Sequence, residues 1–516
     1  MSLLPALLAV GFASAASANE GAGDKRETKL GPGCALDRPA VAHHAGGVPV
    51  KRGQANRQDA PVPCVTATGV PTSEVGIVVS NAGTLLVQPA VQTVTGFPLG
   101  VLRSDDQGAS WDFILPSGFD SPPRITPVDQ DIAVDRETGR VFWLMGRPGG
   151  TAQTPRLDMS DDNGVTWFQS PQPPVPLDHS QLFTGKPPQS LRSKLRGYPN
   201  VLYACQGNFP QMCQRSLDGG LSFGPAVTIP VPPEAGAQCR SWGLRGAVDD
   251  HGVVYIPTTP CQKLYVAISR DGGETWQQVL IANREEIGFG ELGLAMDAAG
   301  NLYAAWVDSA DRLPYLAISR DGGLHWGAPQ MIAAPGVNEA ALTHVTAGAR
   351  GRVAVAYYAS KNSPGVPFPP TCNGLSTSCP GYQGETWNTY MTETWNALAS
   401  HPVYWSASLN NPAHPTWYGC SPSEIGVSGR PGTTSGCLGN ANGAAPYWGR
   451  LDYFGITSGP DGTAWAGFAQ ECPKGSPVPG NPNCPSTLRG TAPDSLYGLV
   501  GRLVRVHGEG KEEDDD

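Results

Sequence analysis

Four residues carry side chains suited to acid–base chemistry on a polar ligand. Arg450, Asp452 and Tyr453 lie within four positions of one another, and Glu291 follows a Gly-Phe-Gly segment earlier in the chain. Two carboxylates could serve as a general acid and a general base, while an arginine could hold an anionic group. We therefore take Glu291, Asp452 and Tyr453 as catalytic candidates and Arg450 as a candidate anion-binding residue.

Other polar residues stand at or near the starts of short apolar segments spread along the chain. Besides Arg450, the candidate ligand-binding residues are Glu74, Asp131, Arg245 and His344, which are expected, like Tyr198, at the starts of innermost strands. Arg124 is a further candidate on a flanking loop, as Arg156 and Arg240 are. A ring that mixes arginines, carboxylates and tyrosines favours a binding site for a polar ligand. The alternative is that these charges pair with one another around a water-filled channel.

A sequence repeat indicates which elements position these residues. The pattern S-x-D-x-G-x-[STH]-[WF] occurs five times, with successive spacings of 56, 56, 53 and 50 residues, and it begins at Ser104, Ser160, Ser216, Ser269 and Ser319. A near-constant period of this length is typical of repeat architectures in which each unit is one supersecondary element.

Each repeat unit predicts four short strands. In the fourth unit, residues 244–259 predict two strands around an Asp-Asp-His-Gly turn, and residues 264–282 predict two more around the repeated motif. Two further units, at 339–409 and 451–506, show the strand pattern without the motif. Four-stranded sheets arranged radially protect their edges against one another. The sequence therefore predicts an all-β fold, a β-propeller of seven four-stranded blades, with six blades as the alternative.

The predicted propeller spans residues 74–507, with loop insertions near 361–386 and 409–447 that are rich in Gly, Pro, Ser and Cys. Residues 19–73 are expected to form a largely irregular extension, and the acidic residues 508–516 a disordered tail. The formal net charge of -10 and the lack of a Lys/Arg-rich block argue against nucleic acid or an anionic membrane as partner.

The start of the chain and the cysteines both indicate export. Residues 1–18 resemble a signal peptide, with an apolar run and an Ala-Ser-Ala site, although no Lys or Arg precedes the run. No other stretch approaches the length of a membrane span. The cysteines are even in number and lack C-x-x-C spacing, so we expect mostly disulfides, with a metal cluster or free thiols as alternatives. They are Cys34, Cys64, Cys205, Cys213, Cys239, Cys261, Cys372, Cys379, Cys420, Cys437, Cys472 and Cys484, which form six local pairs if taken in order.

The repeated motif resembles the Asp-box, or BNR, repeat of sialidases and many other extracellular propellers, over about residues 74–330. This resemblance implies that the motif lies at the outer hairpin between the third and fourth strands, away from the ligand face. Its aspartates, which would accept hydrogen bonds from the turn's own backbone, are Asp106, Asp162, Asp218, Asp271 and Asp321. The resemblance thus assigns these residues a structural role.

Sialidases bind a carboxylate with three arginines and use a tyrosine nucleophile together with a glutamate and an aspartate. Their [FY]-R-I-P segment, which supplies the first arginine, precedes the first Asp-box. Here residues 64–102 contain no arginine, and the nearest similar segment, Pro-Arg-Ile-Thr at 123–126, follows the first box. A count of seven units also departs from the six blades usual for sialidases.

These observations favour a secreted, periplasmic or cell-surface sialidase-like propeller, monomeric, that binds an extracellular glycan or another polar ligand at the mouth of its central channel. One alternative is an active exo-glycosidase of the exo-α-sialidase type with a rearranged site, and another is a protein-interaction scaffold. The sequence contains no G-x-S-x-G, H-E-x-x-H or P-loop motif. We expect no cofactor or metal, with calcium in an Asp-rich turn as an alternative.

Overall fold

The computed structural model describes residues 30–51, 60–72, 74–90, 97–98, 100–119, 124–125, 130–145, 155–175, 179–207, 210–232, 243, 245–287, 292–362, 386–418, 455–471 and 496–505. Within these residues the protein is built almost entirely of antiparallel strands, and its helical segments are short 3-10 turns such as Arg192–Lys194. No helix among them has the length and apolar character that crossing a membrane requires.

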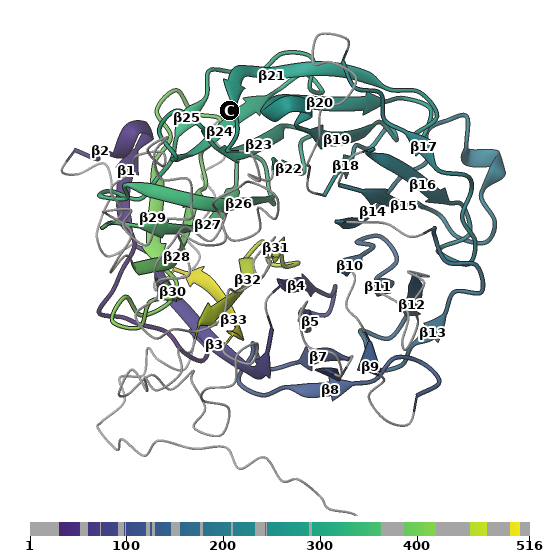
Figure 1. The fold of residues 1–516 in the computed structure, drawn as a ribbon, viewed down its shortest axis with the longest axis horizontal. Coiled ribbons are helices and arrows are strands. Elements are labelled where there is room, and N and C mark those ends of the chain that lie inside the picture. The colour runs from purple at the N-terminus through teal and green to yellow at the C-terminus, as the bar shows by residue number, and fades with distance from the viewer. Residues whose placement is uncertain are drawn as a thin grey trace, which may run out of the picture.

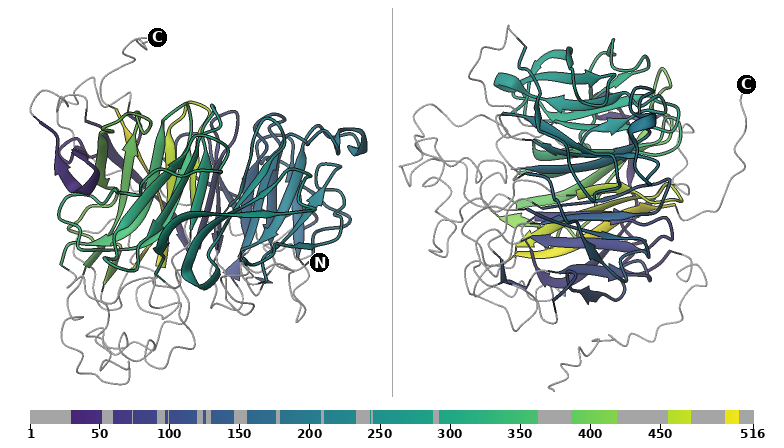
Figure 2. Two further views of the ribbon diagram at one scale, coloured as in Figure 1. Left: turned by 90° about the horizontal axis from the view of Figure 1, so that it is seen from above. Right: turned by 90° about the vertical axis from the view of Figure 1, so that its right-hand side faces the viewer.

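Seven sheets are arranged radially around a central axis, as Figure 1 shows, and Figure 2 shows the same ring from the side. The predicted seven-bladed β-propeller is confirmed. From the axis outward, blade 1 contains β4 (Glu74–Val79), β5 (Leu85–Ala90), β7 (Val101–Ser104) and β8 (Asp112–Ile114). Blade 2 contains β10 (Asp131–Val134), β11 (Val141–Met145), β12 (Arg156–Ser160) and β13 (Phe168–Gln169). A separate two-stranded sheet pairs β6 (Phe97–Pro98) with β9 (Arg124–Ile125).

The next three blades follow the same order. Blade 3 contains β14 (Ser180–Gly185), β15 (Val201–Gln206), β16 (Met212–Ser216) and β17 (Val227–Thr228). Blade 4 contains β18 (Ala247–Val248), β19 (Val254–Thr258), β20 (Lys263–Ser269) and β21 (Gln277–Glu285). Blade 5 contains β22 (Gly293–Met296), β23 (Leu302–Val307), β24 (Pro314–Ser319) and β25 (Gln330–Met331).

Apolar side chains from neighbouring sheets form the core between the blades. Second strands such as β11 and β23 are buried along their whole length, because each blade packs against a neighbour on both faces. Trp143 on β11 and Trp306 on β23 are fully buried in this way. These strands are therefore continuous apolar runs, while the two-residue outermost strands β13, β17 and β25 are largely exposed or half-buried.

Blade 7 is completed by the N-terminal part of the chain. Its inner strands are β31 (Gly455–Ser458), β32 (Ala464–Glu471) and β33 (Leu496–Val504), and its outermost strand is β3 (Val62–Pro71). The expectation of irregular chain up to residue 73 is therefore wrong for this segment. The reason is physical, since the last unit supplies three strands and the ring needs a fourth to cover the edge of β33.

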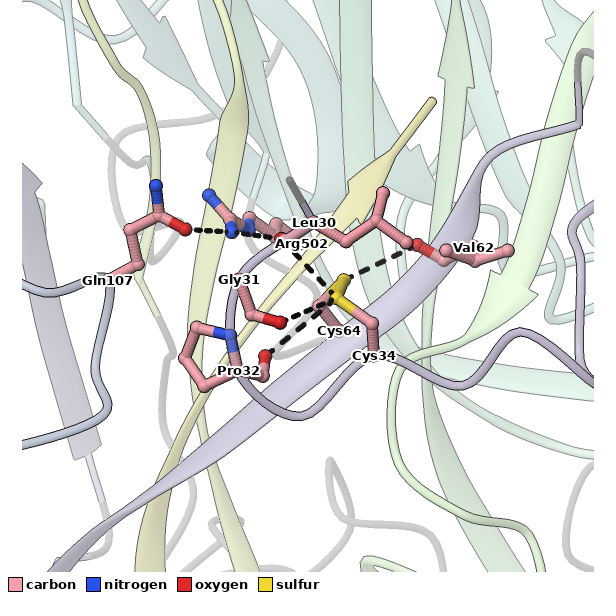
Figure 3. Close-up of a disulfide and its surroundings, with 8 residues drawn as sticks. All are labelled: Leu30, Gly31, Pro32, Cys34, Val62, Cys64, Gln107 and Arg502. Atoms are coloured by element: carbon pink, nitrogen blue, oxygen red, sulfur yellow. Dashed lines mark hydrogen bonds between the residues drawn. A yellow bond between two sulfur atoms is a disulfide. The ribbon is translucent and has the colours of Figure 1, made fainter. Parts of the chain in front are cut away.

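A disulfide and an arginine fix this closure. Cys34 bonds to Cys64 on β3, and Arg502 on β33 donates through Nη2 to the carbonyl oxygen of Leu30 at 2.8 Å and to Oε1 of Gln107 at 2.5 Å (Figure 3). Burial lowers the pKa of Arg502 to about 10. The N-terminal segment, blade 7 and the first Asp-box turn are thereby joined at one place.

Blade 6 is the largest sheet. Its four radial strands are β26 (Glu339–Ala347), β27 (Val353–Ser360), β28 (Thr386–Thr394) and β29 (Tyr404–Ser408). The N-terminal strands β1 (Val41–His44) and β2 (Val48–Pro49) extend it beyond β29, and β30 (Trp417–Tyr418) pairs with β28. Residues 41–49, expected to be irregular, and 417–418, expected in a loop insertion, thus form strands.

The five Asp-box turns share one geometry. In the first, Asp106 accepts hydrogen bonds from the hydroxyl of Ser104 at 2.7 Å and from the backbone N–H of Ser110 at 2.9 Å, while Ser104 Oγ accepts from Gly108 N–H at 2.8 Å. The same contacts recur around the other four aspartates. The glycine two positions after the aspartate has a positive φ in each turn, which a side chain would disfavour.

Two disulfides join described cysteines, Cys34 to Cys64 and Cys205 to Cys213, and Cys261 is also disulfide-bonded. No cysteine among the described residues is free. The first two bonds are the first two local pairs expected from sequence order. The expected signal peptide, the acidic tail, most of both loop insertions and the remaining cysteines lie outside the described residues.

Candidate functional site

A cavity of about 270 Å³ lies where the innermost strands of all seven blades meet at the axis. It is lined by residues from β4, β10, β14, β18, β22, β26 and β31 or from the segments just before them. A second cavity, of about 340 Å³, is lined by the later residues of several of these strands and by the turns that follow them. Arg245 lines both cavities, so the two are adjoining parts of one central channel.

Asp131 and Arg245 form an ion pair inside this channel. Arg245 Nη2 donates to Asp131 Oδ1 at 2.5 Å and to the carbonyl oxygen of Ile132 at 2.8 Å. Asp131 also accepts from the backbone N–H groups of Ile132 at 2.9 Å and Leu182 at 2.6 Å. Burial raises the pKa of Asp131, and the guanidinium of Arg245 opposes that effect. Blades 2, 3 and 4 are thus joined around one carboxylate.

Arg136 lies in the part of the channel lined by the later strand residues. Its guanidinium donates to the carbonyl oxygen of Val79 in blade 1 at 2.7 Å and to that of Ser458 in blade 7 at 2.5 Å. Burial, and next the charge of Arg245, lower its pKa. Nearby, Lys186 and Asp250 form an exposed ion pair at 2.7 Å. Charged side chains therefore line the channel on both sides of Arg245.

Two buried histidines, His179 and His344, also line the first cavity. His344 follows an irregularity in β26, where the pairing register shifts between Ala341 and His344 and Leu342 has a φ of 51°. Such bulges re-aim the side chains that follow them. His179 precedes β14 and itself has a φ of 50°. Sequence analysis selected His344 and missed His179, which no motif marks.

The cavity brings together three of the predicted ligand-binding residues, Asp131, Arg245 and His344. Glu74 and Arg124 begin β4 and β9, but only their backbones are described. The other candidates, Glu291, Arg450, Asp452 and Tyr453, and also Arg240, lie outside the described residues.

Tyr198 and Arg156 do not line the cavity formed by the inner strands. Tyr198 precedes the second strand of blade 3, where its buried hydroxyl donates to Asp135 at 2.6 Å, so its placement at the start of an inner strand was wrong. Arg156 lies on the third strand of blade 2, bonds to Asp158 at 2.9 Å and is largely buried. Both residues have structural partners instead.

The first cavity can bind charge, but the described residues that line it include no carboxylate pair. Among the described residues that line the first cavity, Asp131 is the only carboxylate, and it is bonded to Arg245. Glycosidases of the common type place two carboxyl groups across the scissile bond. No cluster of three or more His, Cys, Asp or Glu side chains suited to a metal occurs within the described residues.

Residues 267–278, which include the fourth repeated motif, match the family described as BNR/Asp-box repeat. The chain carries Asp-box repeats. This match confirms the resemblance inferred from the five motifs. No curated protein sequence matches the chain.

Solved structures with a similar fold share few identical residues with this Asp-box propeller. One is a protein of unknown function from Dyadobacter fermentans, 13% identical with a TM-score of 0.39 over 73% of this chain and 94% of that one. Another is the NanB sialidase from Streptococcus pneumoniae, 11% identical with a TM-score of 0.40 over 84% and 69%. A third is a xyloglucanase from Xanthomonas campestris, 15% identical with a TM-score of 0.38 over 66% and 54%.

Proposed function

We propose that this protein is an extracellular Asp-box propeller that binds a glycan or another polar ligand at the mouth of its central channel. The observation that carries the proposal is the geometry of Arg245. Only Nη2 of its guanidinium is bonded to Asp131 and Ile132, and 35% of the side chain stays exposed. Arg245 lines both cavities, and its remaining N–H groups make no hydrogen bond among the described residues, so they are available as donors to a carboxylate or hydroxyl oxygen.

The surroundings of Arg245 also suit a polar ligand. Asp131 fixes the guanidinium in place before a ligand arrives, which reduces the entropy lost on binding. His179 and His344 line the same cavity. The disulfides fit a protein that works in an oxidising, extracellular environment.

A glycan array followed by titration calorimetry on the best ligand tests the proposal. We expect Arg245→Gln to weaken binding about tenfold or more, because a charge-assisted hydrogen bond is lost. Arg140→Gln is the control, since Arg140 also pairs with an aspartate, Asp161 at 2.6 Å, but lies outside the cavity. Equal affinity of folded Arg245→Gln and wild-type protein, or a lack of any polar ligand, would refute the proposal.

The exo-glycosidase alternative has a separate test. Release of fluorophore from aryl glycosides, a sialoside included, should be absent if the protein only binds. Turnover that is lost in Glu291→Gln or Asp452→Asn, but retained in Arg140→Gln, would instead assign those residues the catalytic roles predicted from the sequence.

A further inference from the structure

A third cavity lies between blades 3 and 4, apart from the central channel. It has a volume of about 420 Å³ and shares no lining residue with the two channel cavities. Its walls come from β15, β16 and β17 of blade 3 and from the Asp-box turns of blades 3 and 4. We call it the blade 3–4 pocket. Its volume lies at the lower end of the range for small-molecule sites, about 300–1,000 Å³.

Two buried side chains that line the blade 3–4 pocket hold unused hydrogen-bonding groups. The hydroxyl of Tyr203 and the amide nitrogen of Gln214 have no hydrogen-bond partner among the described residues, although Tyr203 is 0% and Gln214 2% exposed. Gln214 Oε1 accepts from the backbone N–H of Val175 at 3.0 Å, which fixes its amide nitrogen as the free donor. Unpaired buried polar groups are rare and call for an explanation.

A comparison among the Asp-box tryptophans points to the same place. Trp111, Trp167 and Trp326 each donate their indole N–H to a backbone carbonyl oxygen, at 3.2, 3.1 and 3.1 Å. The indole nitrogen of Trp276, in the blade 4 turn, is buried without a partner among the described residues. Trp276 packs in the apolar cluster that contains Tyr203. Blade 4 therefore departs from the repeated geometry beside this pocket.

The polar groups around the pocket, rather than its net charge, favour a ligand that accepts hydrogen bonds. Arg196 and Arg215 both line it, and Arg215 donates to the carbonyl oxygen of Gly272 at 2.8 Å and to Glu274. The carboxylate of Asp218 is already occupied by Ser216 and Ser222. The unused groups are thus donors. The charged residues that line the pocket balance, with Arg196 and Arg215 against Asp218 and Glu274, and no ion pair of the Arg196 side chain occurs among the described residues.

We propose that the blade 3–4 pocket is a second binding site, which takes a small organic carboxylate no larger than one sugar ring. The acceptor oxygens of the ligand would bond to the Tyr203 hydroxyl and the Gln214 amide, and its negative charge would lie near Arg215 and Arg196. Donors held by a rigid sheet, with little water to compete, suit such recognition. This inference is independent of the function proposed for the channel.

Calorimetry on the full-length protein tests the site with glucuronate and lactate as probes, and with glucose and glycerol as their neutral counterparts. We expect at least one acid to bind and its neutral counterpart not to bind. Tyr203→Phe should weaken acid binding about tenfold while leaving the melting temperature unchanged or higher, because it removes an unpaired hydroxyl. Gln214→Glu should abolish acid binding, because it places a carboxylate where the donor stood.

Tyr303→Phe is the matched control, since the hydroxyl of Tyr303 donates to Asp297 at 2.8 Å in blade 5, away from the pocket. It should lower stability and leave acid binding unchanged. Absence of binding by both acids, or equal binding by wild type and Tyr203→Phe, overturns the proposal. So does loss of acid binding in Arg245→Gln, which would assign the acid to the channel, or a crystal structure that shows only ordered water in the pocket.

Discussion

Blades 1 to 5 differ from blades 6 and 7 in how their outer strands are connected and held. Each of the first five closes its outer hairpin with an Asp-box turn, whose charged aspartate collects donors from its own turn. In blade 6 the corresponding turn uses an amide, and Asn396 Oδ1 accepts from the Thr394 hydroxyl and the Val403 N–H, both at 3.0 Å. The neutral turn keeps the hydroxyl contact, but it takes its backbone N–H from seven residues further on rather than four, and it carries no charge.

Blades 6 and 7 are also where distant parts of the chain meet. The N-terminal strands β1 and β2 extend blade 6, and β3 closes blade 7. His43 on β1 is fully buried and its Nε2 lies 2.8 Å from the hydroxyl of Ser406 on β29. Within blades 1 to 5, repeated local turns are enough to connect the outer strands. Ring closure instead depends on contacts between residues far apart in sequence, and such contacts cost more conformational entropy to form.

Removing a disulfide is expected to change the free energy of unfolding more than any other substitution considered in this comparison. The Cys34–Cys64 bond spans 30 residues and holds the closure, whereas Cys205–Cys213 spans 8 residues within one hairpin. Loop-closure entropy predicts a loss in the free energy of unfolding of about 3.5 kcal/mol for Cys34→Ser/Cys64→Ser and about 2.5 kcal/mol for Cys205→Ser/Cys213→Ser. Denaturant unfolding measures both.

The short disulfide is the matched control, because both variants replace one disulfide with the same two side chains. A larger loss for the Cys205 and Cys213 variant would contradict the view that ring closure is the point most dependent on a covalent bond.

A buried acid in blade 6 gives the second prediction. Burial raises the pKa of Glu393 to about 7, although the charges of Arg352 and Arg505 oppose this effect. Its ordinary value is 4.5, so the folded state binds more protons than the unfolded state between these two values. The free energy of unfolding therefore falls as the pH rises from 4.5 to 7, by on the order of 3 kcal/mol, and changes no further above that range.

Glu393→Gln removes this titration. We expect the variant to be similar to wild type near pH 5 and more stable than wild type at pH 8, as chemical denaturation at several pH values can show. A stability difference independent of pH would mean that Glu393 is ionised throughout in the folded protein. Glu137→Gln, at an exposed turn of blade 2, is the control for a general effect of charge.

The parts of the fold that depend on local sequence patterns could be predicted from the sequence. The Asp-box period fixed the first five blades, since Asp, Gly and an aromatic residue are each required by the turn itself. It did not predict that β3 pairs with β33, because the pairing joins opposite ends of the chain. It misplaced Tyr198 because blade 3 has no Asp-x-x-Gly turn after its first strand, so the strand order had no local mark.

The candidate site was predicted in part for the same reason. Asp131, Arg245 and His344 were selected by their positions at strand starts, but their meeting at one cavity depends on how far the ring curves between blades 2, 4 and 6. The Asp131–Arg245 pair joins blades 2 and 4. The unused donors of the blade 3–4 pocket had no sequence signal, because each is defined by a missing partner rather than by a residue type.

Exchanging the aspartate of an Asp-box turn and the asparagine of the blade 6 turn is expected to change the free energy of unfolding least. It is also the most direct test of whether the charge of the turn matters. Asp162 accepts three hydrogen bonds, from Ser160, Thr166 N–H and the Thr166 hydroxyl. Asp162→Asn replaces one acceptor oxygen with an NH2 group, which cannot accept a hydrogen bond from these donors. We expect it to lower the free energy of unfolding by about 1–2 kcal/mol at pH 7. The reciprocal Asn396→Asp should raise it by a few tenths of a kcal/mol, to about 1 kcal/mol at most, because hydrogen bonds to a charged acceptor are stronger.

The pH dependence separates charge from shape in this exchange. Although burial acts in the opposite direction, hydrogen bonds from Thr166 and Ser160 lower the pKa of Asp162 below its ordinary value of 3.8. A group with a lowered folded-state pKa stabilises the protein above its unfolded-state pKa and loses that contribution as the pH falls through the folded value. The advantage of wild type over Asp162→Asn should therefore shrink as the pH falls below 3.8, as thermal melts at low pH can measure. A difference that persists unchanged in acid would show that the turn depends on the shape of the side chain, and the charged and neutral turns would then be equivalent.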